Sequence, residues 1–185
     1  MILLELFLIL KKALQTVFRF ALCAALLIAL VICWGGERTY SESDARHEVA
    51  SSLQISPLPT CTVPTALDNH GGFLGDGETL IRMQFSDDSF WEAIQDRATW
   101  GALSDRADVG AVVDWLQYGW EYSRAFYASV SKVENGYCYF KDRQTDAASE
   151  DAYSAEPTLD RYSYNFTLAV YDVETRVLYY YKLDT

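Results

Sequence analysis

Residues 162–183 read YSYNFTLAVYDVETRVLYYYKL, and this stretch decides the fold class that we predict. Two runs rich in aromatic and β-branched residues, 162–171 and 177–183, flank the polar segment 172–176. Such runs are typical of β-strands, and a short polar connection between two of them predicts a β-hairpin. We therefore expect the last part of the chain to form antiparallel sheet.

Further patterns upstream extend the predicted sheet. Apolar and polar residues alternate over 78–85, which is the period of a half-buried strand. Residues 126–133 and 137–141 flank Asn135-Gly136, a dipeptide that favours tight hairpin turns. Together with the C-terminal pair, these segments predict an antiparallel sheet of about four or five strands.

Helical patterns occur between the predicted strands. Ser89 and Glu92 fit a capping box at the start of one helix, whose apolar face continues to Ala98. The spacing of apolar residues over 109–116 indicates a second amphipathic helix, whereas residues 120–127 fit helix and strand equally well. We therefore predict an α+β domain in which two helices cover one face of the sheet.

The N-terminal region contains an uncharged apolar run, FALCAALLIALVICW, at residues 20–34. If the helix extends back to include residues 13–34, it is long enough for a hydrocarbon core of about 30 Å. Lys11, Lys12 and Arg19 precede or enter this segment, and basic residues stay on the cytoplasmic side. We expect a single transmembrane helix in contact with the lipid bilayer, with a cytoplasmic N-terminus. A cleaved signal peptide is the alternative, although the usual small-residue cleavage pattern is missing after the run.

The chain is accordingly expected to have three parts. Residues 1–36 form the anchor in the cell membrane. Residues 37–66 are rich in Pro and Ser and are expected to be a spacer with a possible short helix, since apolar residues recur every four positions over 45–53. Residues 67–185 form the extracytoplasmic α+β domain, which is close to the commonest domain size.

The charge distribution restricts the classes of partner. The chain has 26 acidic and 15 basic side chains and a net charge of −11. Residues 1–36 hold three basic side chains and one acidic one, so the remainder carries −13. Such an exterior repels phosphate backbones, and we expect no nucleic-acid partner. Cationic partners stay possible, and solvation of the domain is the plainer role of the charge.

The best candidate for a functional loop spans residues 68–78. It places one imidazole and three carboxylates among glycines that permit unusual backbone angles. The residues of interest are Asp68, His70, Gly71, Gly72, Asp76 and Glu78. Such a set could hold a metal ion or pair a general base with an orienting acid. Asp and Asn beside Gly are also ordinary turn residues, so a purely structural turn is the alternative. We assign no catalytic residue, no metal ligand and no cofactor.

The cysteines and aromatic residues leave two further questions open. Cys61 and Cys138 lie in the part expected outside the cytoplasm, where they could form one disulfide or stay reduced. The chain also contains five Trp, thirteen Tyr and nine Phe. Exposed aromatic side chains could stack on sugars or anchor a peptide, whereas buried ones would only pack the sheet.

Two motifs carry a family resemblance. Residues 70–77 read HGGFLGDG, and residues 163–172 read SYNFTLAVYD, continuing through LYYY at 178–181 to Asp184-Thr185. In these motifs the chain resembles an uncharacterised family of membrane-anchored proteins from Gram-positive bacteria, with HGGFxGDG and YNFTLAxYD…LYYYxLDT patterns. Leu74 departs from the pattern, where a second histidine is expected. The resemblance implies an anchored exterior domain and no particular activity.

These observations favour a membrane-tethered extracytoplasmic domain that is not an enzyme and that binds an envelope protein or serves an envelope-associated role. Two alternatives are a binder of cell-wall glycan through exposed aromatic residues and a metal-assisted or acid–base hydrolase centred on His70. Convergence of His70, Asp76 and Glu78 in one pocket would favour the hydrolase.

Overall fold

The chain divides into two compact units, residues 1–36 and 37–185, which we describe separately. The computed structural model describes residues 11–12, 14–27, 38–71, 75–145, 149–156 and 158–185. In the first unit residues 14–27 are helical, and their apolar side chains are exposed. None of the helices within the described ranges has both the length and the apolar content needed to cross a bilayer. The predicted anchor at 13–34 includes residues 13 and 28–34, which lie outside the described residues.

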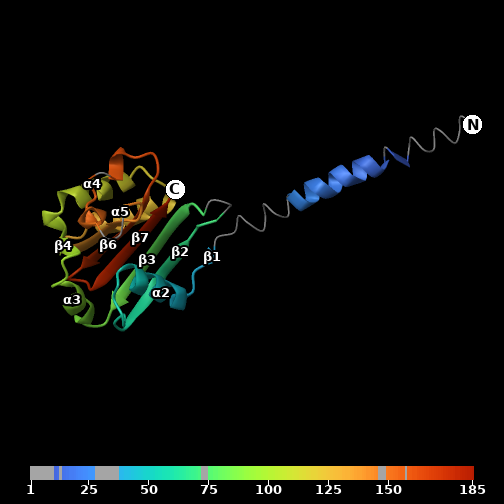
Figure 1. The fold of residues 1–185 in the computed structure, drawn as a ribbon. Helices are drawn as coiled ribbons and strands as arrows, with labels where there is room; N and C mark the ends of the chain where they lie inside the picture. The colour runs from blue at the N-terminus through green and yellow to red at the C-terminus, as the bar shows by residue number, and fades with distance from the viewer. Residues whose placement is uncertain (1–10, 13, 28–37, 72–74, 146–148, 157) are drawn as a thin grey trace, which may run out of the picture. The chain divides into compact units, whose positions relative to one another are not determined.

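The second unit contains a sheet in the order β1-β2-β3-β7-β6-β5-β4, in which every neighbouring pair is antiparallel (Figure 1). The strands are β1 Arg38–Thr39, β2 Cys61–Asp68, β3 Gly77–Phe85, β4 Trp100–Ala102, β5 Gly136–Asp142, β6 Asn165–Asp172 and β7 Val177–Asp184. The predicted α+β class is confirmed. The sheet has seven strands rather than four or five, because strands β1, β2 and β4 were not predicted and the strand predicted over 126–133 is not part of the sheet.

Helices pack on both faces of this sheet. They are α2 Glu42–Ser52, α3 Ser89–Ile94, α4 Ala107–Leu116 and α5 Glu121–Val130. Buried residues of α2 and α3 join one hydrophobic cluster, and those of α4 and α5 join another. We name the two sides of the sheet the α2 face and the α5 face. The prediction that helices cover one face is wrong, because successive residues of the central strands alternate between two buried clusters.

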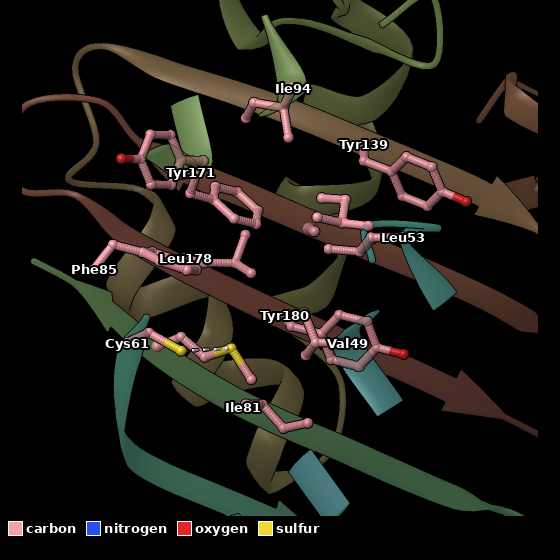
Figure 2. Close-up of a cluster of buried hydrophobic side chains, with 14 of the residues drawn as sticks. Val49, Leu53, Cys61, Ile81, Phe85, Ile94, Tyr139, Tyr171, Leu178 and Tyr180 are labelled. Carbon is pink, nitrogen blue, oxygen red and sulfur yellow. Dashed lines mark hydrogen bonds between the residues drawn. The ribbon is translucent and has the colours of Figure 1, made fainter. Parts of the chain in front are cut away.

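Tyrosines supply much of the core on the α2 face. Figure 2 labels Tyr180 of β7, Val49 of α2 and Ile81 of β3 in one cluster of buried side chains. The hydroxyl of Tyr180 donates to Glu48 at 2.7 Å, so burial leaves this polar atom satisfied. Tyr139 and Tyr171 belong to the same cluster. For these tyrosines the alternative in which aromatic residues pack the sheet is confirmed.

The region expected to be a spacer is part of the folded domain. The short helix predicted over 45–53 is confirmed as α2, and Ser41 caps it by accepting a hydrogen bond from Asp44 N at 3.1 Å. The prolines that suggested a linker precede or enter β2. Pro64 lies where the register of β2 against β3 shifts, and proline is tolerated at such an interruption because no ladder hydrogen bond is required of it.

Two local predictions in the middle of the chain are also wrong. Residues 126–130 belong to helix α5 rather than to a strand, with Phe126 and Val130 buried one turn apart. Asn135-Gly136 therefore leads from a helix into β5 and is not a hairpin turn. The capping box predicted with Ser89 as the N-cap residue is also wrong. The N-cap residue of α3 is Asp88, and its side chain makes no capping hydrogen bond. The C-terminal hairpin is confirmed as β6 and β7.

Candidate functional site

The predicted functional loop is the connection between β2 and β3. Asn69 N donates to Glu78 O at 3.0 Å, and Glu78 N donates to the side-chain Oδ1 of Asn69 at 2.6 Å. Gly71 N donates to Asp76 O at 3.3 Å, which carries the pairing further into the loop. Asp76 is exposed, and Gly72 lies outside the described residues. The base of the loop is thus organised by turn chemistry of the kind that Asn and Gly supply.

His70 lies between two carboxylates. Its Nδ1 is 2.5 Å from Asp68 Oδ1, and its Nε2 is 3.0 Å from Asp184 Oδ2. Thr79 Oγ1 donates to Asp68 at 3.0 Å, and Arg143 Nη2 lies 2.6 Å from Asp184 Oδ1. We call these five residues the His70 cluster. Its charged members alternate in sign from Asp68 to Arg143, so each carboxylate faces at least one cation.

This arrangement keeps the imidazole protonated. Burial alone would lower the pKa of His70, but the hydrogen bonds to Asp184 and Asp68 and their charges outweigh it and raise the pKa to about 9. Burial likewise opposes ionisation of the two carboxyls, yet their bonds to His70 hold the pKa of Asp68 and of Asp184 below the usual value. At neutral pH both ring N–H groups of His70 are engaged. The side chain is therefore unsuited to act as a general base.

The His70 cluster connects several strands at one end of the sheet. Asp68, Thr79 and Asp184 belong to β2, β3 and β7. Arg143 follows β5, and its guanidinium also donates to Leu183 O at 2.9 Å. A side chain at Gly77 would place its Cβ 2.5 Å from His70 Cα, so glycine is needed for His70 to approach β3. These contacts indicate a stabilising role for the cluster.

Glu78 belongs to a different environment, although it is only one residue from Thr79. Neighbouring residues of a strand point to opposite faces, so Thr79 meets the His70 cluster and Glu78 lies on the α5 face. Its fully buried carboxylate accepts from Ser123 N at 2.9 Å, Tyr122 N at 3.3 Å and Tyr181 OH at 2.7 Å. Glu78 thus serves as a long-range cap for the first turn of α5, where a negative charge is favoured.

A pocket of about 400 Å³ opens beside Glu78. Its walls are mainly aromatic side chains from the end of α4, the connection from α4 to α5, the segment before β6, and strand β7: Trp115, Tyr118, Trp120, Tyr162, Tyr164 and Tyr181. The exposed fractions are 81% for Tyr118, 53% for Trp120 and 107% for Tyr162. The rings of Trp115 and Tyr164 lie 4.8 Å apart and are inclined by 46°. We call this the aromatic pocket, and its volume is in the range of small-ligand sites.

The loop residues singled out in the sequence do not converge. Asp68 and His70 are hydrogen-bonded to each other, Asp76 is exposed, and Glu78 lies on the opposite face of the sheet. Within the described parts of the chain, no group of three or more His, Cys, Asp or Glu residues is arranged to hold a metal ion. The aromatic pocket was not predicted. Its one visible signal is the run WLQYGWEYS at 115–123, which is unusually aromatic for a connection between helices.

The disulfide considered between Cys61 and Cys138 is not formed. Both are free, buried thiols, and they belong to the clusters on the α2 face and the α5 face respectively. Burial raises the pKa of both thiols, to about 11 for Cys138. The two cysteines are therefore packed in the core as small apolar residues.

Comparisons of the chain with protein-family models, with curated proteins and with solved structures gave no match. The resemblance to membrane-anchored proteins stays a prediction.

Proposed function

We propose that residues 37–185 form a non-catalytic binding domain whose ligand occupies the aromatic pocket. The observation that carries this proposal is the exposure of Tyr118, Trp120 and Tyr162 around one concavity. Large aromatic side chains gain free energy when they leave water, and a cluster of them around a pocket is typical of a recognition site.

The state of His70 supports binding over hydrolysis. Both of its ring nitrogens are engaged by carboxylates, and its raised pKa keeps it protonated at neutral pH. A hydrolase centred on this residue would need a free nitrogen to accept a proton from water or from a nucleophile. The candidate acids of the loop give it no shared pocket, because Asp76 is exposed and Glu78 faces α5.

The proposal includes attachment to the cell membrane through a single-pass N-terminal anchor, with a cytoplasmic N-terminus and the binding domain outside. Support comes from the exposed apolar side chains of helical residues 14–27, among them Leu14 at 71% and Phe20 at 73%. The basic residues before the apolar run and the resemblance to anchored proteins of Gram-positive bacteria favour the same orientation. Protease added to intact cells should degrade the domain, and protection of it would contradict this topology.

The test of the binding function uses the full-length chain in detergent micelles and isolated envelope fractions. We expect the chain to retain a component of these fractions and Trp120→Ala to reduce the retained amount at least fivefold. Trp91→Ala is the matched control, because Trp91 lies on α3 at the α2 face, away from the aromatic pocket. Equal retention by the two variants would contradict the proposal, and thermal unfolding of each variant verifies that it is folded.

A further inference from the structure

We infer that the ligand of the aromatic pocket is an organic cation of the alkylated or quaternary ammonium class. The inference rests on the proposed binding function and adds the chemistry of the ligand. The observations behind it are the inclination of two aromatic walls, a buried carboxylate beside them that has no cationic partner among the described residues, and the charge of the surrounding domain.

The aromatic side chains line a pocket, and the two rings whose inclination is known are not coplanar. Trp115 and Tyr164 are inclined by 46° to each other, and Trp120 and Tyr162 reach the pocket from two different connections of the fold. A sugar ring stacks on a single flat surface, whereas a roughly spherical alkylammonium group gains from several ring faces directed at it. The electron-rich faces of Trp and Tyr attract such a cation.

Glu78 differs from the other buried carboxylates of the domain. Asp68 faces His70, and Asp142 lies 2.6 Å from Arg161. For Glu78, no cationic partner is found among the residues that the structure describes; its bonds come from two backbone N–H groups and a phenol. Burial and the charge of Glu78 raise the pKa of Tyr181, so the phenol keeps its proton as the donor. The carboxylate of Glu78 therefore lies beside the aromatic pocket with hydrogen-bond donors but no cationic partner in the part of the chain that the structure describes.

This carboxylate acts on a ligand through its field. Glu78 is fully buried, so a ligand reaches the aromatic rings first and experiences the charge across a medium of low dielectric constant. The N-terminus of α5 offsets part of the charge but not all of it. Arg124, which donates to Gly119 O at the edge of the pocket, is exposed and is screened by solvent. The acidic domain around the pocket favours the approach of cations over anions.

The experiment compares choline with 3,3-dimethyl-1-butanol, a neutral molecule of the same shape. The full-length chain is held in a polyoxyethylene detergent, which has neither an ammonium group nor a sugar. Binding is followed by tryptophan fluorescence and by ligand-observed NMR. We expect saturable binding of choline and at least tenfold weaker binding of the alcohol. Glycerophosphocholine is titrated in parallel, and the tighter of the two cations indicates whether the source is a free amine or a lipid headgroup.

Two variants test the parts of the site separately. Trp120→Ala removes an exposed wall and is expected to weaken choline binding about tenfold, the effect of one desolvated cation–π contact, while Trp91→Ala leaves it unchanged. Glu78→Gln keeps the shape of the side chain and removes its charge, and we expect the preference for choline over the alcohol to fall about tenfold. If Glu78→Gln does not fold, the Trp120 variant and the choline–alcohol ratio still decide the question.

The outcomes separate the inference from the proposed function. Equal affinity for choline and the alcohol, or unchanged preference in folded Glu78→Gln, overturns the inference and leaves the aromatic pocket as a binding site. Binding of N-acetylglucosamine oligomers that depends on Trp120, without binding of choline, overturns it in favour of glycan. Absence of choline binding together with Trp120-independent retention of envelope components overturns both proposals.

Discussion

The His70 cluster and the surroundings of Glu78 place buried carboxylates on opposite faces of one end of the sheet. In the His70 cluster, Asp68 and Asp184 each contact a cation, and the charges alternate in sign. Glu78 is held by backbone N–H groups and the hydroxyl of Tyr181. In the His70 cluster the polar groups pair with one another, whereas Glu78, beside an open pocket, has hydrogen-bond donors but no cationic partner among the described residues.

The comparison teaches that residue type alone is a poor guide to function. His70 with two carboxylates has the composition of a proton-transfer site, yet every ring N–H already has an acceptor. Glu78 was grouped with His70 in the sequence, but it lies on the other face of the sheet, beside the aromatic pocket and with no cationic partner among the described residues. The distribution of partners distinguishes the two carboxylate environments.

The largest expected effect concerns the surroundings of Glu78. Glu78→Ala leaves Tyr122 N, Ser123 N and Tyr181 OH without their acceptor in a buried environment. We expect a loss of about 3 kcal/mol or more in the free energy of unfolding, measured by urea denaturation. Glu121→Ala removes an exposed acid from the first turn of the same helix and should cost less than about 1 kcal/mol. Similar losses of stability in the two variants would contradict the role of Glu78 as the buried acceptor for the first turn of α5.

The next effect is the dependence of stability on pH that the His70 cluster imposes. The folded state binds the proton of His70 more tightly than the unfolded state, whose pKa is about 6.5, since the folded pKa is about 9. The stabilisation is fully present below pH 6.5 and is lost as the pH rises from there to 9. It amounts to about 3 kcal/mol at most. We expect His70→Gln to flatten the stability profile over this window, and an unchanged slope would contradict the assignment.

The carboxylates of the His70 cluster make the stability depend on pH in the acidic range as well. The pKa values of Asp68 and Asp184 are lowered in the folded state. Their contribution is therefore present above the usual carboxyl pKa and is lost as the pH falls from there through the lower pKa of the folded state. Maximum stability from this cluster is expected between about pH 4.5 and 6.5.

The smallest of these effects tests the packing of His70 on β3. Gly77→Ala places a methyl group against the backbone of His70, and we expect a loss of about 2 kcal/mol with a changed histidine NMR signal. Gly110→Ala is the matched control in α4, where the added Cβ meets no atom within 4 Å apart from the adjacent residues and the backbone of its own helix. That control should be neutral or stabilising by about 1 kcal/mol. Retention of the raised pKa of His70 in Gly77→Ala would show that the close approach is not required.

Local patterns predicted the elements that depend on local interactions. Alternation over β3 and the runs of β6 and β7 identify the centre of the sheet, and the four-residue spacing of Ala45, Val49 and Leu53 identifies α2. Helix α5 was misread because its apolar residues fit two periods. Strand β2 was missed because its proline lies at a register shift that the sequence does not reveal.

The candidate sites depended on contacts between distant parts of the chain. The proximity of Asp68 and His70 was readable because they are two residues apart, but Asp184 joins them only through the pairing of β3 with β7. The opposite directions of Thr79 and Glu78 follow from strand geometry once the strand is placed. The aromatic pocket combines residues 115–120 with 162–164, and no local pattern relates these segments.

The interrupted register at Pro64 affects the tendency of one molecule to pair its strands with another. Strand β1 pairs with Leu67 and Asp68, and among the described residues the remaining part of β2 has no strand on that side. Proline has no N–H to offer a foreign strand, and a bulge bends the backbone away from a regular template. This side of β2 is thus a poor seed for intermolecular β-aggregation, which favours solubility of the domain at high local concentration.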